Sequence, residues 1–487
     1  MSDALAHLEP RSVWENFADL LRIPRPSGSE AAIAKHLSEV AAKHGCEAKK
    51  DAIGNLIINV PATPGREKAP VVILQGHLDM VAEKNKDVAH DFLKDPIRPR
   101  IEGDWIYATG TTLGADNGIG VASAMAAAID PKVKHGPLQL LFTVDEETGL
   151  TGAMKLDASL LRGKTLLNLD SEEDGVLFVG CAGGSDTHLF FAPAWGTPDR
   201  GASPFLLEVK GLRGGHSGLN IIENRGNALK ILARALAGGI IDGIPLELAT
   251  LTGGSKHNAI PREAEATVYL PSSDEARLRK VIERLRASLK TELEGIDDGL
   301  EIQLSPGTAA PRVMTKESCH DFVHLLLALP HGNLGMSQAI PGLVETSSNL
   351  AVVTMEEGDR LKIVASSRSS VGPALDAVLL SIRAIGSLAG AEVVGRDGYP
   401  GWKPNMASPL LKTVREVFAK LWGKEPKVTA IHAGLECGLL GDKVPGMDMI
   451  SFGPHMEGVH SPDERLNIPS VGRFFNALAE ILDRLSK

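Results

Sequence analysis

The sequence predicts an α/β protein in which a domain with a mixed sheet flanked by helices is interrupted by an inserted α+β domain. The chain has 487 residues, which is too long for one ordinary hydrophobic core. Continuous apolar runs, typical of strands buried on both faces, occur before residue 185. Strands and amphipathic helices alternate afterwards, and the first pattern then returns. We therefore expect a domain of residues 1–185 and 399–487, with an insertion of residues 186–398.

The composition excludes some classes of partner. The formal net charge is −10, whereas nucleic acids and anionic membranes bind basic surfaces. Four cysteines lie far apart without a C-x-x-C pair, which is typical of a reduced intracellular chain. The first residues lack the apolar segment of a signal peptide. We expect a cytoplasmic protein with no nucleic-acid or membrane partner.

The first part of the chain leads to a buried strand that ends in polar side chains. The helices and strands expected before it cover residues 11–22, 29–44, 46–51 and 55–60. Residues 71–74 form a continuous apolar run, and His77 and Asp79 follow it closely. In open α/β sheets, ligands bind at the carboxyl ends of the strands. A carboxylate often orients an imidazole ligand, so this pair suits a metal ligand and its support.

Further strands of the same domain also end at carboxylates. A second buried strand expected at 138–144 leads into Asp145, Glu146 and Glu147, and a short strand at 166–169 leads into Asp170. Alone, each could be a solvated acidic turn. Asp116 lies in a glycine-rich loop before a helix, where a helix cap is the simple alternative. We expect these carboxylates to lie together at one edge of the sheet.

The pattern of strands and helices in the inserted region predicts two successive units of a duplicated ferredoxin-like fold, without a strict residue repeat. Its expected elements cover residues 205–209, 227–236, 266–270, 274–293, 321–329, 361–364 and 373–388. After residue 399 we expect a helix at 409–421, a strand at 447–452 and a final helix from Ser470. His455 and His460 lie in the loop before that last helix.

Five side chains form a metal-ligand set: His77, Asp116, Glu147, Asp170 and His460. Two imidazoles and three carboxylates, without a thiolate, are typical of a two-metal hydrolytic site. Such a site uses a bridging carboxylate, and a free carboxylate nearby can take the proton of the attacking water. His455 competes with His460 as a ligand.

Five motifs resemble, in order, those of the zinc aminopeptidase/carboxypeptidase family, which includes aminoacylases, carnosinases and tripeptidases. They are GHLDMV at 76–81, GADNG at 114–118, DEETG at 145–149, LDSEE at 169–173 and HSPDE at 460–464. Within the family the whole chain is similar to the bacterial aminoacyl-histidine dipeptidases, including HAGLECG at 432–438 and YPGWKP at 399–404. The resemblance implies a di-zinc exopeptidase catalytic domain interrupted by a lid.

The resemblance also implies a ligand arrangement. His77 and Asp170 would hold one metal, Glu147 and His460 the other, and Asp116 would bridge them, followed by a cis peptide bond to Asn117. The cofactor would be two divalent ions, with zinc expected and cobalt or manganese as alternatives. Which ion is bound is open, because sites of nitrogen and oxygen ligands accept several metals.

Further roles come from the same resemblance. Asp79 would support His77, and Glu146 would be the general base that later protonates the leaving amine. His216, in the GGHSG loop at 214–218, would help polarise the scissile carbonyl. The alternative for His216 is an exposed histidine in a flexible glycine turn.

Three more residues would bind the substrate. Asn258 and Arg368 would bind its C-terminal carboxylate, and Glu436 its free α-amine. A solvated strand charge is the alternative for Arg368, and a helix-surface charge for Glu436.

We therefore expect a metallo-dipeptidase that cleaves short peptides, above all Xaa-His dipeptides including carnosine-like ones, under a closing lid. An N-acyl-amino-acid amidohydrolase on the same scaffold is the nearest alternative, and a non-catalytic, metal-free binding protein is another. The expected partner is a small peptide, and a homodimer is left open.

Overall fold

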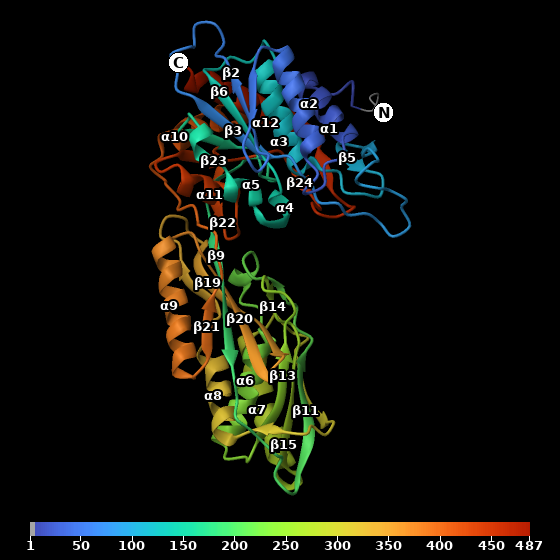
Figure 1. Cartoon of the computed structure of the whole chain (residues 1–487), viewed down its shortest axis with the longest axis vertical. Coiled ribbons are helices and arrows are strands. Elements are labelled where there is room, and N and C mark those ends of the chain that lie inside the picture. Colours follow the sequence, from blue (N-terminus) through green and yellow to red (C-terminus); the bar gives the residue numbers. More distant parts are fainter. Residues whose placement is uncertain (1–4) are drawn as a thin grey trace. The chain divides into compact units, whose positions relative to one another are not determined.

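The protein is described by a computed structural model that covers residues 5–487 (Figure 1). The chain divides into two compact units. Unit 1 runs to Gly180 and also contains Pro404–Ala430 and Leu435–Lys487, whereas unit 2 contains Cys181–Lys403 and Ile431–Gly434. The insertion expected at 186–398 lies within unit 2, but the short segment 431–434 joins unit 2 without any signal in the sequence analysis.

Unit 1 is built on an eight-stranded mixed sheet of order β1-β2-β6-β3-β7-β23-β8-β22. Its strands are β1 Glu47–Lys50, β2 Leu56–Val60, β3 Val72–His77, β6 Leu138–Thr143, β7 Thr165–Asn168, β8 Val176–Cys181, β22 Lys427–Ile431 and β23 Asp448–Ser451. Strand β3 pairs in parallel with both β6 and β7. The carboxyl ends of these three strands therefore meet at one edge of the sheet.

Helices flank this sheet (Figure 1). They are α1 Arg11–Arg22, α2 Ala31–Lys43, α3 Ala115–Ile129, α4 Glu146–Gly149, α5 Thr151–Lys155, α10 Pro409–Trp422, α11 Glu436–Lys443 and α12 Ile468–Leu485. A small second sheet has the order β24-β25-β5-β4, with β4 Pro99–Glu102, β5 Trp105–Ala108, β24 Met456–Glu457 and β25 Arg465–Asn467. All six residues of β3 and of β6 are buried, which agrees with the apolar run at 71–74 and with the buried strand expected at 138–144.

Unit 2 contains a nine-stranded sheet of order β16-β11-β15-β13-β19-β20-β9-β21, with β18 paired to β19. Its strands are β9 Gly183–Phe191, β11 Ala202–Lys210, β13 Glu247–Gly253, β15 Ala264–Pro271, β16 Glu301–Pro306, β18 Gly332–Met336, β19 Val344–Glu356, β20 Arg360–Ser369 and β21 Glu392–Gly395. The helices are α6 Ala228–Ile241, α7 Glu275–Glu292, α8 Lys316–Ala328 and α9 Gly372–Leu388. Short pairs are β10 Trp195–Gly196 with β17 Val313–Met314, and β12 Gly215–His216 with β14 Ala259–Ile260.

The unit 2 sheet consists of two halves with the same β-α-β-β-α-β order, typical of a ferredoxin-like unit. Half A is β11-α6-β13-β15-α7-β16, and half B is β9-α8-β19-β20-α9-β21. Their central strands β13 and β19 pair antiparallel at Gly253 and Val353. The two halves were expected to follow one another along the chain. They are nested instead, because β9 precedes half A while the rest of half B follows it.

Helices α6, α7, α8 and α9 contribute buried side chains to one hydrophobic cluster with the unit 2 sheet, including Leu232, Leu278, Phe322 and Ile382. Within residues 5–487, none of the helices is both long and apolar enough to span a membrane.

Candidate metal centre and a separate cationic cluster

The parallel strands of unit 1 place the predicted ligands at one sheet edge. His77 is the last residue of β3, and Glu147 lies at the start of α4, just after β6. Asp170 follows β7, Asp116 lies in the first turn of α3, and His460 lies in the loop between β24 and β25. The peptide bond between Asp116 and Asn117 is cis, as the resemblance implied.

The carboxylate of Asp116 lies between two imidazoles. Its Oδ1 is 3.1 Å from His77 Nε2, and its Oδ2 is 3.2 Å from His460 Nε2. Asp170 Oδ1 lies 3.4 Å from His77 Nε2, and Glu147 Oε2 lies 2.9 Å from His460 Nε2. The five residues therefore form two groups of three that share Asp116, and each group has ligand atoms close enough to hold one ion.

Two oxygen atoms in this cluster show that it fits cations. Glu147 Oε1 and Asp170 Oδ1 are buried and accept no hydrogen bond from the described chain. A buried carboxylate oxygen without a partner is costly unless a cation or proton neutralises it. Oxygen and imidazole donors without thiolates suit divalent ions such as zinc or manganese.

The crowding of buried carboxylates shifts the pKa values of the groups in this cluster. Burial raises the pKa of Asp170 to about 7, with the neighbouring Asp116 and Glu147 acting in the same direction. Hydrogen bonds to Asp116 and Glu147 raise the pKa of His460 to about 11. Burial likewise holds the pKa of Glu146 well above its ordinary value. The cluster thus retains protons on its own, and bound cations would take their place.

Asp79 connects the imidazole of His77 to the loop that carries Glu146 and Glu147. Its Oδ1 lies 3.4 Å from His77 Nδ1, opposite the ring nitrogen that faces Asp116. The same carboxylate accepts hydrogen bonds from the backbone N–H groups of Glu146 at 3.1 Å and Glu147 at 3.2 Å. Asp79 therefore fixes the predicted general base and two predicted ligands in one arrangement.

Glu464 holds the loop that carries Asp116, a role the sequence analysis missed. Its side chain is buried and accepts hydrogen bonds from four consecutive backbone N–H groups, at 2.6, 2.9, 2.8 and 3.3 Å, from Leu113, Gly114, Ala115 and Asp116. Glu464 lies in the HSPDE motif with His460, so the motif offered a signal but the role did not follow from it.

Arg25 completes this support and was also missed. Its buried guanidinium donates to the carbonyl oxygens of Leu78 at 2.9 Å and Asp79 at 2.8 Å, and also to that of Gly114. Gly114 has a φ of +69°, and a Cβ there would lie 2.7 Å from Arg25 Nη2. Only glycine therefore fits this close approach without displacing the guanidinium.

Glu436 is not the helix-surface charge considered as an alternative, because it is only 1% exposed. Its Oε2 accepts hydrogen bonds from Gln75 Nε2 at 2.5 Å and Thr143 Oγ1 at 2.7 Å. Its Oε1 is buried and accepts none from the described chain. Burial raises its pKa to about 8.

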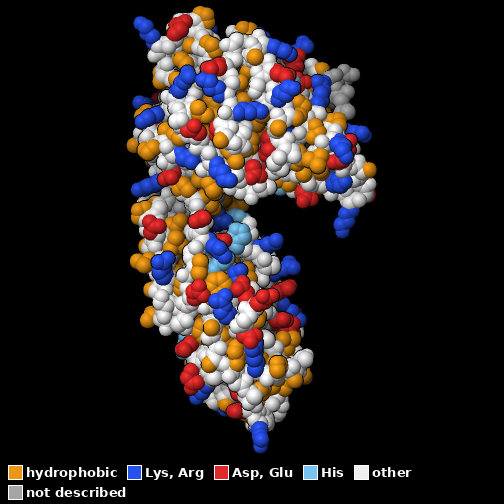
Figure 2. Space-filling model, in the orientation of Figure 1, with side chains coloured by type: hydrophobic (Ala, Val, Ile, Leu, Met, Phe, Trp, Pro, Cys, Tyr) orange, Lys and Arg blue, Asp and Glu red, His pale blue; other side chains and the backbone are white. Residues whose placement is uncertain are grey.

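Unit 2 holds a separate group of basic side chains around Arg368, and Figure 2 shows histidines gathered on this unit. His216 Nδ1 accepts hydrogen bonds from the backbone N–H groups of Gly218 at 3.1 Å and Leu219 at 3.0 Å. The ring proton must then reside on Nε2. Burial, aided by Arg368 and His257, lowers the pKa of His216 to about 4. His216 is therefore a neutral donor.

Arg368 and His432 belong to the same cluster. Arg368 is 8% exposed and donates to Tyr399 Oη at 2.9 Å, while its buried Nε has no acceptor in the described chain. His432 Nε2 lies 2.7 Å from Ser347 Oγ. Burial, aided by Arg368 and His216, lowers the pKa of His432 to about 4. The guanidinium is thus the fixed positive charge of a cluster with free donors. Asn258 directly precedes β14. Its backbone carbonyl oxygen accepts a hydrogen bond from the backbone N–H of Ser217 at 2.8 Å.

The model of peptidase family M20/M25/M40 matches residues 73–484 of the chain. The chain belongs to this family. It is therefore a peptidase, as predicted, and the motifs that carried the resemblance all lie within the matched range. The mixed α/β fold predicted for it is confirmed as well, because solved structures match almost the whole chain.

Two relatives of this M20/M25/M40 peptidase are similar over nearly their full length. The cytosol non-specific dipeptidase of Escherichia coli (strain K12) is 42% identical over 99% of both chains. The crystal structure of aminoacylhistidine dipeptidase from Vibrio alginolyticus has a TM-score of 0.93 and 40% identity, covering 99% of this chain and 98% of the other. An aminopeptidase of Bacillus cereus shares the fold, with a TM-score of 0.58 and 17% identity over 99% of this chain and 100% of the other.

His455, the competing ligand, lies elsewhere in the peptidase. Its Nε2 is 3.0 Å from Glu457 Oε1, and its ring packs on Trp105. It belongs to none of the groups of potential metal ligands in the described chain. The structure thus places His460, and not His455, beside Asp116.

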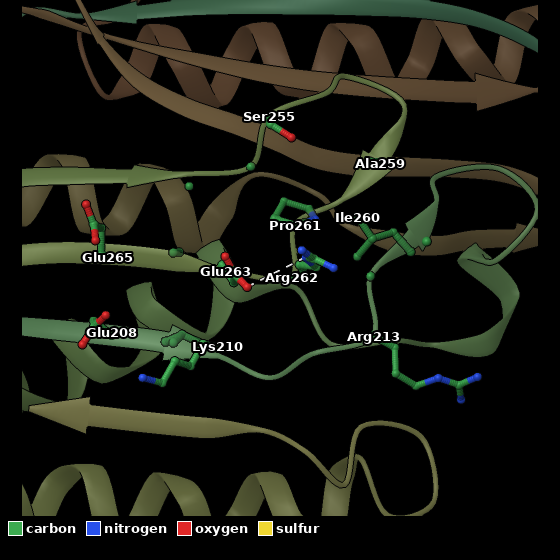
Figure 3. Close-up of a pocket in the computed structure, with 16 residues that line it drawn as sticks. Glu208, Lys210, Arg213, Ser255, Ala259, Ile260, Pro261, Arg262, Glu263 and Glu265 are labelled. Atoms are coloured by element: carbon green, nitrogen blue, oxygen red, sulfur yellow. Dashed lines mark ion pairs between the residues drawn. The ribbon is translucent and has the colours of Figure 1, made fainter. Parts of the chain in front are cut away.

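A cavity of about 660 Å³ lies in unit 2 next to the loop of His216 (Figure 3). Its lining carries both signs of charge, and Arg262 and Glu263 form an ion pair of 3.9 Å in it. None of the predicted site residues lines this cavity.

Proposed function

We propose that this peptidase is a metallo-dipeptidase that cleaves Xaa-His dipeptides, including carnosine-like ones. The observation that carries the proposal is the Asp116 carboxylate held between His77 and His460, 3.1 and 3.2 Å from their Nε2 atoms. The relatives from Escherichia coli and Vibrio alginolyticus, a dipeptidase and an aminoacylhistidine dipeptidase, support the choice of dipeptides and of histidine. The first relative also supports a cytosolic location.

The proposed ligands divide into two sets. His77 and Asp170 would hold one divalent ion, Glu147 and His460 the other, and Asp116 both. We propose zinc, with cobalt or manganese as alternatives. When bound, such a pair supplies Lewis acidity and lowers the pKa of a water molecule at the site.

In this mechanism Glu146 moves the proton. Its carboxylate takes a proton from the attacking water and later delivers it to the amine that leaves. Asp79 keeps His77 in the required orientation and holds the backbone N–H of Glu146 at 3.1 Å. The buried surroundings that raise the pKa of Glu146 also favour its acting as an acid in the second step.

The cationic cluster suits the other end of the substrate. We propose that Arg368 and Asn258 bind the C-terminal carboxylate, and that the Nε2–H of His216 donates to the scissile carbonyl oxygen. Glu436, with its unpartnered Oε1, would accept from the free α-amine.

The test is a panel of Xaa-His dipeptides, tripeptides and N-acetylated amino acids, assayed with and without a chelator. We expect dipeptide cleavage that is lost with chelator and returns on adding zinc, with little turnover of the longer or acylated compounds. A preference for N-acetylated amino acids would contradict the proposal and favour the amidohydrolase. Cleavage unchanged by full metal removal would contradict the metal centre.

A further inference from the structure

The YPGWKP motif at 399–404 has no part in the proposed function, yet it lies against the start of β9. Tyr399 and Gly184 exchange two backbone hydrogen bonds of 3.0 Å. Strand β9 pairs antiparallel with β20, where Arg368 lies directly opposite Gly184. All of these residues belong to unit 2. The backbone therefore fixes Tyr399 beside Arg368.

The ring of Tyr399 lies between two glycines. A Cβ at Gly184 would lie 2.9 Å from the Tyr399 hydroxyl oxygen, and a Cβ at Gly434 would lie 2.9 Å from Cε2 of the ring. A larger residue at either position would displace the ring, because the packing leaves no space for it. Gly434 belongs to the HAGLECG motif at 432–438, so two motifs of the dipeptidase resemblance meet at one side chain. The glycine opposite Arg368 leaves room for the hydroxyl to reach the guanidinium.

The hydrogen bond from Arg368 occupies one end of its guanidinium. Nη1 donates to the Tyr399 hydroxyl at 2.9 Å. The Nε–H of the same guanidinium is buried and has no acceptor in the described chain. Nε and Nη2 form an edge with which arginine can bind both oxygens of a carboxylate. The phenol therefore holds the guanidinium at Nη1 and leaves this bidentate edge open.

Tyr399 holds Arg368 without cancelling its charge. Burial raises the pKa of the Tyr399 phenol, so the hydroxyl is neutral at physiological pH. In the described chain Arg368 donates to this phenol and forms no ion pair with a carboxylate. Asp186, also on β9, lies 2.9 Å from His257 Nδ1 instead. A carboxylate in the place of the phenol would neutralise the guanidinium and weaken its attraction for an anionic substrate.

We propose that Tyr399 is a positioning residue that sets the preference for substrates with a free C-terminal carboxylate. This inference rests on the proposed function, in which Arg368 binds that carboxylate. The hydroxyl fixes the guanidinium with its bidentate edge open and its positive charge intact. Without this hydrogen bond the guanidinium samples several rotamers, and ordering it around a substrate costs side-chain entropy. A substrate with a C-terminal amide gains less from the fixed charge, so it loses less.

The experiment compares an Xaa-His dipeptide with its C-terminal amide, each as a substrate or competitive inhibitor of the full-length, metal-loaded Tyr399→Phe variant. This variant keeps the ring between the two glycines and removes only the hydroxyl. KM for the free acid is expected to rise roughly tenfold, with kcat and the binding of the amide little changed. Tyr269→Phe is the matched control, because Tyr269 is buried in the same unit and its hydroxyl donates to Ala310 O at 3.1 Å. It is expected to leave both substrates unaffected.

Gly184→Ala displaces the same hydroxyl without removing it, because the new Cβ would lie 2.9 Å from the oxygen. KM for the free acid is expected to rise in this variant as well. The melting temperature of each variant serves as the folding control. Wild-type KM for the free acid in either folded variant would overturn the proposal, as would an equal rise for the free acid and the amide.

A double-mutant cycle tests whether Tyr399 acts through Arg368. Once Arg368→Met has removed the guanidinium, adding Tyr399→Phe is expected to change KM by less than about twofold, because the two residues share one interaction. A full effect of Tyr399→Phe in that background would overturn the positioning role. If Arg368→Met alone leaves KM for the free acid unchanged, it is the proposed function of Arg368 that fails.

Discussion

Histidine behaves in opposite ways in the two units. In unit 1, hydrogen bonds to two carboxylates raise the pKa of His460 to about 11. In unit 2, burial and a neighbouring guanidinium lower the pKa of His216 to about 4. One cluster has an excess of negative charge and demands cations, whereas the other has a fixed positive charge and neutral imidazoles. The residue type alone therefore says little about its chemistry, and the surrounding charges decide it.

Glu146→Gln is expected to break the acidic cluster's function most strongly. The variant removes the proton carrier but keeps the size of the side chain, so kcat is expected to fall by roughly 10²–10⁴-fold. Metal content, measured by elemental analysis, should stay at the wild-type value. A variant with unchanged kcat would contradict the role of general base.

Arg368→Met tests the cationic cluster. Loss of hydrogen bonds to a charged group is expected to cost about 1.5–3 kcal/mol in substrate binding, roughly a 10- to 150-fold rise in KM. Steady-state kinetics on an Xaa-His dipeptide would measure it. Arg312→Met, in the same unit but on its surface, is the control. If KM stays unchanged in the Arg368 variant, another group binds the substrate carboxylate.

Glu464→Gln separates support of the metal centre from its chemistry. The amide can accept fewer hydrogen bonds from the loop at 113–116, so Asp116 loses its fixed position. Metal affinity is expected to fall by roughly 10- to 100-fold. Chelator competition would measure this change, and Glu464→Asp tests whether the charge suffices without the length. Wild-type affinity in both variants would show that the loop holds its shape unaided.

His432→Gln gives the smallest expected effect, and its sign follows from the lowered pKa. His432 has a pKa of about 4 in the folded protein and an ordinary value of 6.5, so the unfolded chain binds its proton first. The contribution of neutral His432 to the free energy of unfolding is therefore fully present above the ordinary pKa of 6.5. It is lost as the pH falls towards the pKa of about 4 in the folded protein. The slope is at most about 1.4 kcal/mol per pH unit.

Urea unfolding between pH 7 and pH 4 would measure the free energy of unfolding for both proteins. The decline with falling pH should be shallower in the variant. An identical decline in both would show that the imidazole of His432 does not titrate differently on folding.

Most of the metal centre could be predicted because ligands of open α/β sheets bind at the carboxyl ends of the strands. β3 and β6 are buried on both faces, so the apolar residues at 71–74 and around 140–142 indicated buried strands, and parallel pairing brings His77 and Glu147 to one edge. Helix α9 was predicted to within one residue, as 373–388 against Gly372–Leu388. Both results rest on local patterns of hydrophobicity.

Other features depend on distant partners and left no local pattern. Glu464 accepts from backbone N–H groups about 350 positions earlier, and backbone donors have no side-chain signature in a sequence. Arg25 lies between Pro24 and Pro26, outside the helices expected at 11–22 and 29–44, and its acceptors are backbone carbonyl oxygens. The nested order of halves A and B was missed because β9 was not predicted, and a pattern of strands does not reveal which strand pairs with which.

The segment 431–434 affects when unit 2 can fold during protein synthesis. Ala182 N hydrogen-bonds to Ile431 O and Ala433 O, each at 3.0 Å, and His432 bonds to Ser347. Unit 2 therefore depends on residues that leave the ribosome only after the whole insertion has been synthesised. An excised fragment that stops at Lys403 would lack these contacts.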